Sequence, residues 1–565
     1  MSVQLLLVPI ISLAVIAAAQ EMETVWAVFS FNVYGDSTPI VFPQPGLLTS
    51  LGAQNLHDIG SLFRSRYVDG SGDGSNDTTV ENSPVMGISQ FRLDIDQIQV
   101  YSAADYASQA SALAFMQGLY PPDAVSNDSI IEDSALLANG SVVHAPLGGY
   151  QYPRIRVPGL SDSNSILISG NLGCGAYQRH RIRYEHSKEA EQLRSETASF
   201  YTDLYNSVLH RAFSKAEVGY GNAYEIFRYL QYQMIHDAAV PELLSEEDYQ
   251  RAKALADQYM LAANANVSSV HVSEPSISTI AGRTLSRLIL QSFEQNIASQ
   301  GSIAKMTMVF GDVEPAMSLA ALALLPSSAN SNFAMVPDLG SSFIFELYSL
   351  NTPADTVYPA TSDLFVRFYF RNGSAVDAPF QLHSLFGNGP SQSYLPFTEF
   401  QQNLAQIQVS STKEWCMSCH STAIFCEGAV PSVKAKQSGL GLVGAGGIGA
   451  AVTLVTVALL AAVFRLCKSH IHRRPRSSNL GGFKGSQKMF SDPDISFAPA
   501  MGNFSMTGNT AARRPGRTIR GHERTGSWEM EHKYTPTTIS GLPDNGDDGL
   551  EVNFDSEPVR PRETV

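Results

Sequence analysis

Residues 25–39 read VWAVFSFNVYGDSTP, an apolar run that ends in a tight turn. The first nine of these residues are rich in valine and phenylalanine, which favour a buried β-strand. Gly35 and Pro39 interrupt the strand, and Thr49 precedes a helical pattern over residues 50–67. A strand, a turn and a helix in this order predict the first unit of an α/β fold.

The alternation of strands and helices continues toward the C-terminus. Further β-rich apolar runs occupy residues 97–102, 304–310 and 343–350. Helical patterns occupy residues 189–209, 224–235, 246–263 and 280–298. The alternation predicts a three-layer α/β/α sandwich, and the uninterrupted helical block in the middle predicts an inserted helical cap.

The charge balance limits the class of function. The chain carries 53 acidic and 38 basic residues, a formal net charge of −15. A nucleic-acid-binding body needs a basic face, so we expect no nucleic-acid partner. No residue cluster suggests a ligand set, and we predict neither a metal nor a cofactor. Five cysteines are too few to frame a small disulfide-rich domain, so the fold must rest on a large hydrophobic core.

The first 19 residues, MSVQLLLVPIISLAVIAAA, are apolar and end in small residues. This pattern predicts a signal peptide over residues 1–19. No basic residue precedes the apolar core, and an uncleaved membrane anchor is the alternative. The short apolar length and Pro9 favour cleavage.

A second apolar segment, residues 439–464, contains no charged residue. At about 1.5 Å per residue it is long enough to span a hydrocarbon core of about 30 Å. Basic residues follow at once, which predicts a cytosolic C-terminus: Arg465, Lys468, Arg473, Arg474 and Arg476. The chain is therefore predicted to be a single-pass type I membrane protein of the secretory pathway, and both the plasma membrane and the vacuole remain open.

After the predicted signal peptide, this topology divides the chain into four parts. Residues 20–427 form the ectodomain, residues 428–438 a polar stalk, and residues 439–464 the transmembrane helix. Residues 465–565 are rich in Ser, Arg, Gly, Pro and Asp without periodicity, which predicts a disordered cytoplasmic tail that recruits protein partners. Five N-x-S/T sequons precede the apolar segment and predict a glycoprotein: Asn76, Asn127, Asn139, Asn266 and Asn372.

Four cysteines lie in the predicted ectodomain: Cys174, Cys416, Cys419 and Cys426. In an oxidising compartment they predict two disulfides, and three connectivities are open. We favour a bond from Cys174 to one of the other three, which would attach the segment before the stalk to the body of the domain. Cys416 and Cys419 also form a W-C-x-x-C motif of the thioredoxin type, so redox catalysis is the alternative to structural disulfides.

Four segments together resemble the histidine acid phosphatases, especially their fungal members. They are residues 25–39, residues 48–54 (LTSLGAQ), residues 101–122 with YSAAD at one end and GLYPP at the other, and residues 311–325 (GDVEPAMSLAALALL). The resemblance covers roughly residues 24–430. It implies a phosphoglycerate mutase-like sandwich with a helical cap, and phosphomonoester hydrolysis as the ancestral activity.

Members of that family carry Arg-His-Gly-x-Arg-x-Pro after the first strand. The resemblance implies that the histidine attacks phosphorus, that the arginines clamp the phosphate oxygens, and that a later His-Asp pair protonates the leaving oxygen. Gly35, Thr38 and Pro39 are retained here, but other residues stand at the positions of the chemical groups: Val33, Tyr34, Ser37, Ala107, Val313 and Glu314.

The eroded motif argues against the family chemistry. Each hydrogen bond to a charged group is worth about 1.5–3 kcal/mol, so the lost arginines forfeit much of the phosphate binding. Asp36 and Asp312 would repel a dianion, and Glu314 is the residual candidate for a proton donor. The sequence therefore predicts a catalytically degenerate pseudophosphatase with a binding or scaffolding role. An active acid phosphomonoesterase with a rearranged site is the alternative.

Overall fold

The computed structural model describes residues 23–69, 82–122, 135–143, 145–267, 276–325, 331–350 and 357–427. The predicted signal peptide, stalk, transmembrane helix and tail lie outside these residues, as do Asn76 and Asn127. Among the residues that the structure describes, no helix has the length and apolar character needed to cross a membrane.

One eight-stranded sheet forms the centre of the described fold, with the order β3-β2-β4-β1-β5-β6-β7 and with β8 paired to β6. Strands β1 to β4 run parallel to one another, whereas β5 pairs antiparallel with β1 and the remaining strands continue that pairing. The strands are β1 (Glu23–Val33), β2 (Ile98–Ser102), β3 (Ile155–Arg156), β4 (Met306–Gly311), β5 (Ser342–Leu350), β6 (Leu364–Arg371), β7 (Gln381–His383) and β8 (Tyr394–Pro396).

The register brings the C-terminal ends of three parallel strands together. Val33 at the end of β1 pairs with Gly311 at the end of β4, and Ser102 at the end of β2 pairs with Phe310. In open α/β sheets, functional sites form outside this edge. The turn after Val33 and the segments after Ser102 and Gly311 therefore meet at one place.

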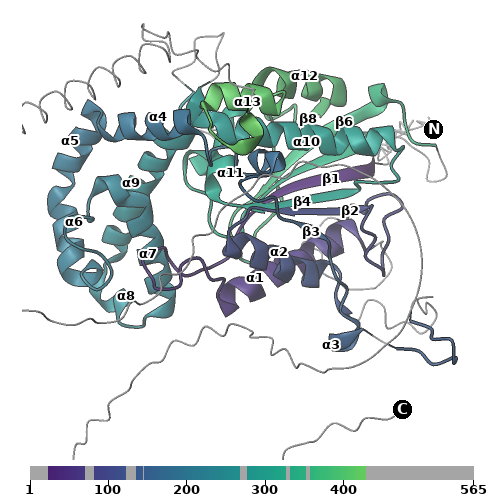
Figure 1. Cartoon of the computed structure of the whole chain (residues 1–565), viewed down its shortest axis with the longest axis horizontal. Coiled ribbons are helices and arrows are strands. Elements are labelled where there is room, and N and C mark those ends of the chain that lie inside the picture. The colour runs from purple at the N-terminus through teal and green to yellow at the C-terminus, as the bar shows by residue number, and fades with distance from the viewer. Residues whose placement is uncertain are drawn as a thin grey trace, which may run out of the picture. The chain divides into compact units, whose positions relative to one another are not determined.

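Helices cover both faces of the sheet (Figure 1). Helices α1 (Ser50–Tyr67) and α2 (Tyr106–Leu119) cover one face, and α10 (Ile280–Ala298), α11 (Val313–Leu322) and α12 (Phe397–Ile407) cover the other. Helices α1 and α2 approach closely because Gly60 and Gly118 lie at their contact. A Cβ atom at Gly60 would lie 2.0 Å from the Phe115 carbonyl oxygen, which no side chain tolerates.

The predicted cap lies between β3 and β4 and stands to one side of the sheet (Figure 1). Its helices are α4 (Gly175–Glu185), α5 (Lys188–Glu196), α6 (Ala198–Leu204), α7 (Ala223–His236), α8 (Val240–Leu243) and α9 (Glu246–Asn264). The single helix predicted over residues 189–209 is wrong, since the chain breaks between α5 and α6. Thr197 leaves helical geometry and its hydroxyl donates to the Leu193 carbonyl at 2.6 Å, a local bond that competes with the helix.

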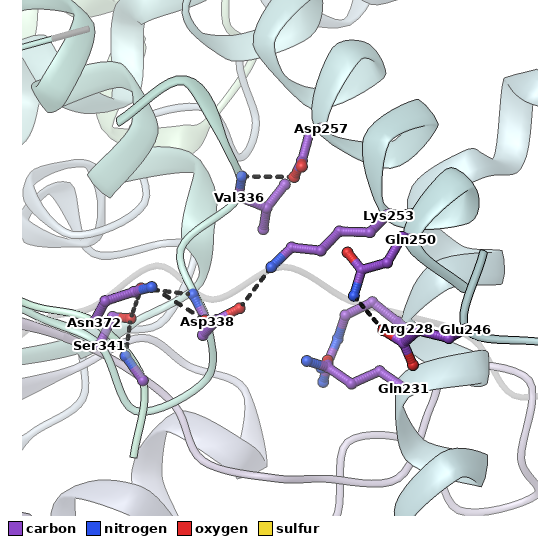
Figure 2. A network of polar contacts seen from close by, with 11 residues as sticks. Arg228, Gln231, Glu246, Gln250, Lys253, Asp257, Val336, Asp338, Ser341 and Asn372 are labelled. Atoms are coloured by element: carbon purple, nitrogen blue, oxygen red, sulfur yellow. Dashed lines mark hydrogen bonds and ion pairs between the residues drawn. The ribbon is translucent and has the colours of Figure 1, made fainter. Parts of the chain in front are cut away.

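Figure 2 shows one attachment of the cap to the sheet domain. Lys253 of α9 lies 3.2 Å from an Asp338 carboxylate oxygen, and the other oxygen of Asp338 accepts from the Asn372 side chain. Nearby, Asp257 of α9 accepts from the Val336 backbone N–H at 2.8 Å. Polar contacts from one helix therefore fix the cap to the loop before β5.

Two disulfides attach the C-terminal segment of the described chain. Cys174, at the start of α4, bonds Cys419 in α13 (Thr412–Cys419), and Cys416 bonds Cys426. The favoured bond from Cys174 is confirmed. The two cysteines of the W-C-x-x-C motif bond different partners, which is the arrangement of structural disulfides.

Candidate functional site

The turn after β1 is held by the residues that the family pattern retains. The Gly35 N–H donates to Ser111 Oγ at 3.0 Å, and the Thr38 hydroxyl donates to the Gln44 carbonyl at 2.7 Å. A Cβ atom at Gly35 would lie 2.5 Å from Leu56 Cδ2, so the turn can pack onto α1 only with glycine there. The scaffold of the motif is therefore intact.

The residues at the family's chemical positions offer no positive charge. Val33 and Ala107 are buried, and Val313, the first residue of α11, is buried as well. Ser37 is buried in the turn, and Tyr34 keeps part of its surface exposed while its hydroxyl is enclosed by protein. Val33 and Ala107 are therefore apolar residues at two positions where the resemblance implies arginines, and Ser37 is an uncharged residue at the third.

One cation reaches the turn from the cap. The Arg228 guanidinium of α7 lies 5.6 Å from the centroid of the Tyr34 ring, and its Nη2 approaches Ser37 Oγ to 3.5 Å. A guanidinium over an aromatic face is a cation–π arrangement. The sequence analysis did not identify Arg228, because its contacts cross 191 residues of chain.

A second cap residue binds the turn at Asp36. His236 Nε2 lies 2.6 Å from Asp36 Oδ2, and the Thr49 hydroxyl donates to the same oxygen. The His236 ring stacks on Tyr232 at 4.2 Å. Tyr224, Arg228, Tyr232 and His236 recur every four residues, so they lie near one face of α7. That spacing was the signal in the sequence that could have identified both residues.

Acidic groups occupy the opposite side of the site. Asp312 caps α11 by accepting from the Val313 N–H at 2.7 Å, and Asp105 caps α2 by accepting from the Ser108 N–H at 2.8 Å. Burial raises the pKa of Asp312, and the nearby Asp105 adds to the rise. Burial and Asp312 together raise the pKa of Glu314 to about 8. Glu314 is therefore a protonated carboxyl group at acid and neutral pH, the state that a proton donor requires.

The same physical effects keep the Tyr34 phenol, which the resemblance places at the nucleophile position, in its protonated form. Burial raises the pKa of Tyr34 far above its usual value of about 10, and Asp312 raises it further, although Arg228 opposes both. The hydroxyl therefore stays protonated throughout the physiological range. A neutral phenol is a poor nucleophile until a base accepts its proton, and one candidate for that base is Asp312, which is hydrogen-bonded to Tyr34.

A cavity of about 10 Å³ lies between α7 and the loop before β5, with Tyr224, Arg228, Val313 and Asp338 among its lining residues. That volume holds about one water molecule. Among the residues that the structure describes, no group of three or more His, Cys, Asp and Glu side chains could hold a metal ion.

The described fold and site define a capped α/β protein with its site at the ends of parallel strands. The family model of the histidine phosphatase superfamily (branch 2) matches residues 37–371, and the chain belongs to this superfamily. The match begins at Ser37, so Val33 and Tyr34 lie just before it. No curated protein matches the chain.

Solved phytase structures are similar to this chain at low identity. The phytase from Citrobacter braakii is 13% identical and has a TM-score of 0.40, with 69% of this chain and 98% of that chain covered. Hafnia alvei phytase in complex with tartrate is 13% identical and has a TM-score of 0.41, with 69% of this chain and 98% of that chain covered. The phytase from D. castellii is 11% identical with a TM-score of 0.38, and 71% of this chain and 82% of that chain are covered.

Proposed function

We propose that this protein is a membrane-anchored pseudophosphatase whose ectodomain binds or scaffolds rather than hydrolyses. The observation that carries the proposal is Tyr34. It stands at the position of the family's nucleophilic histidine, and burial keeps its hydroxyl protonated. Without a nucleophile, no covalent phosphoenzyme forms.

Charge at the site supports the same conclusion. Phosphate clamping in the family needs several arginines, whereas Arg228 is the cation found against this turn. Asp105 and Asp312 lie close enough to interact electrostatically, and Glu225 of α7 is a further neighbour of Asp312. At neutral pH these carboxylates oppose the binding of a phosphate dianion.

Glu314 retains one part of the ancestral chemistry. A carboxyl group with a pKa of about 8 can donate a proton to a leaving oxygen. Protonation helps only after a nucleophile attacks phosphorus, so Glu314 alone does not produce turnover. Together with Arg228, however, it is the observation that favours the second candidate, an active acid phosphomonoesterase with a rearranged site.

One assay separates the two candidates. The purified full chain is incubated with p-nitrophenyl phosphate between pH 4 and 7, with and without vanadate, and Glu314→Gln serves as the matched variant. The pseudophosphatase predicts no vanadate-sensitive turnover by either protein. Vanadate-sensitive hydrolysis by the wild type would establish the phosphomonoesterase instead, and a lower rate in Glu314→Gln would assign the proton donor.

Membrane anchoring is the second part of the proposal. It is supported by the apolar segments at residues 1–19 and 439–464 and by the basic cluster that follows the second segment. Asn139 is exposed and available to a glycan, whereas Asn372 Nδ2 donates to Asp338 at 3.1 Å. We expect an N-glycosidase to lower the apparent mass, and an epitope on the tail to be digested only by protease on the cytosolic side. Glycan-free protein, or an epitope digested from outside, would reverse the topology.

A further inference from the structure

A second cavity lies far from Tyr34, on the face of the sheet that α10 covers. Side chains alternate along a strand. Ile98 and Val100 of β2 therefore bury against α1 and α2, while Gln99 and Tyr101 face α10. The cavity has a volume of about 410 Å³, which lies within the range of small-molecule sites.

The cavity lies well before the strand ends that build the first site. Thr307 of β4 lines it and stands four residues before Gly311, a separation of about 13 Å along a strand. Thr307 is buried, and the buried Ser292 of α10 donates to its hydroxyl oxygen at 2.7 Å. Strand and helix thus form a rigid base for the cavity.

A directed chain of hydrogen bonds fixes one wall. Arg156 donates to the Tyr101 hydroxyl at 2.5 Å, and that hydroxyl donates to Gln99 Oε1 at 3.1 Å. Gln99 Nε2 then donates to Gln295 Oε1 at 3.2 Å. Because Gln295 Oε1 accepts from Gln99, the chain orients the Gln295 amide and leaves its NH₂ group as a donor at the end of the chain.

The other polar side chains of the cavity add both hydrogen-bond donors and hydrogen-bond acceptors. Nine of the 14 residues that line the cavity are polar. Asn164 donates its NH₂ group to Asp162 at 3.0 Å, which leaves its carbonyl oxygen as an acceptor. Gln291 of α10 supplies an amide that can both donate and accept. Donors and acceptors are therefore interspersed around one space.

We propose that this cavity binds a neutral sugar unit, either free or at the end of a glycan. Each sugar hydroxyl donates one hydrogen bond and accepts others, and interspersed amides and hydroxyls satisfy both roles at once. Gln295 and Gln291 supply donors from α10, and Asn164 supplies an acceptor from the opposite rim. Hydrogen bonds to Gln99 and Asp162 orient the Gln295 and Asn164 amides before the ligand arrives, which lowers the entropic cost of binding.

The charges in the cavity argue against an anion. Arg156 is the one cationic residue among the 14 that line it, and its guanidinium lies 5.2 Å from the centroid of the Tyr101 ring to which it also donates. Asp162 lines the same cavity, so the two formal charges balance. A phosphate or sulfate would lie near the Asp162 carboxylate, whose charge offsets that of Arg156.

Binding is tested with the full chain in a detergent that has no sugar head group, after N-glycosidase treatment. The probes are the methyl glycosides of glucose, mannose and galactose and N-acetylglucosamine, observed by saturation-transfer NMR, with inorganic phosphate and sulfate as competitors. A glycan array then separates a free sugar from a terminal glycan unit. The variants are Gln295→Leu and Gln291→Leu, and Gln192→Leu on α5 is the matched control.

We expect saturable binding of at least one neutral glycoside. Loss of one neutral hydrogen bond weakens affinity about tenfold, so Gln295→Leu and Gln291→Leu should each lower it by that factor, whereas Gln192→Leu leaves it unchanged. If the helix variants do not fold, Asn164→Ala on the exposed rim carries the same expectation. The proposal fails if no glycoside binds, if the three cavity variants retain full affinity, or if phosphate or sulfate displaces the glycoside at equal concentration.

Discussion

The Arg228 guanidinium lies over the Tyr34 ring at 5.6 Å, so a cap residue packs against the residue that the resemblance places at the nucleophile position. This contact and the His236–Asp36 pair both join α7 to the turn after β1. Two side-chain contacts therefore join the cap to this turn.

The pH dependence of stability should report on Glu314. Its pKa is raised to about 8 in the folded chain, whereas an unfolded glutamate titrates near 4.5. Between these values only the folded state holds the proton, so the free energy of unfolding falls as the pH rises from about 4.5 to 8. Glu314→Gln removes this loss. We expect the change in the free energy of unfolding that the substitution causes to be more favourable at pH 8 than at pH 5, by an amount on the order of 1–3 kcal/mol.

Urea unfolding at pH 5 and pH 8 measures this difference. Glu247 is an exposed residue of α9, and Glu247→Gln is the control. It should change the free energy of unfolding by a similar amount at the two pH values. Equal effects of Glu314→Gln at both pH values would show that the carboxyl is charged in the folded protein.

Much of the framework could be predicted from the sequence because its elements are apolar and periodic. Helices α1 and α10 begin and end where their patterns do, and β1 follows its apolar run. Strand β6 was missed, because Arg367 and Arg371 interrupt its apolar pattern. Both arginines are buried in the fold, and Arg367 is neutralised by Glu346 on the neighbouring strand, a pairing that only the tertiary structure creates.

The residues of the candidate site also include some that could be assigned from the sequence and some that could not. Gly35 and Thr38 could be assigned to the turn, since their roles are local. Arg228 and His236 could not, because their partners lie 191 and 200 residues away along the chain. In the sequence, the four-residue spacing on α7 is the signal of these long-range contacts, and it is a weak one.

Glu346 is expected to be a critical residue for stability. Its carboxylate is fully buried and accepts from Arg66, Tyr67 and Arg367 at 3.1, 2.7 and 2.6 Å. Burial alone would raise the pKa of Glu346, but Arg367 and Arg66 outweigh it and hold that pKa below its usual value. Glu346→Gln removes the buried carboxylate that Arg66 and Arg367 share and leaves Arg367 with Glu23 as its acidic partner, and we expect a loss of about 3–5 kcal/mol.

Thermal unfolding at several pH values tests this role. A carboxyl group with a lowered folded-state pKa stabilises above its unfolded pKa and loses that contribution as the pH falls through the folded value. The difference in melting temperature between the wild type and Glu346→Gln should therefore be largest at pH 7 and should decrease in strong acid. A gap of the same size at every pH would point to lost packing rather than lost charge.

The two disulfides should differ in their contributions. The Cys174–Cys419 bond spans 245 residues and the Cys416–Cys426 bond spans 10. Chain-entropy arguments give about 5 kcal/mol for the long loop and about 3 kcal/mol for the short one. We expect the double serine variant of Cys174 and Cys419 to unfold at a lower urea concentration than that of Cys416 and Cys426. The reverse order would show that native contacts of α13, and not loop closure, set the stability.

The last prediction concerns restoration of the ancestral chemistry. Tyr34→His alone should give no turnover, because one guanidinium from the cap does not replace a clamp of several arginines. Val33 and Ala107 are buried, so arginines there are unfavourable unless a phosphate pairs with them. We therefore expect slow, vanadate-sensitive turnover only when Tyr34→His is combined with Ser37→Arg, Val33→Arg, Ala107→Arg and Val313→His.

Trapping of phosphate on the new histidine with a radiolabelled substrate measures the first step directly, and Glu314→Gln in the combined variant tests the proton donor. The combined variant must first unfold cooperatively, since a misfolded chain would give no turnover for a trivial reason. Turnover from Tyr34→His alone would contradict the argument. In that case Arg228→Leu should abolish the activity, because the cap cation would itself be the phosphate clamp.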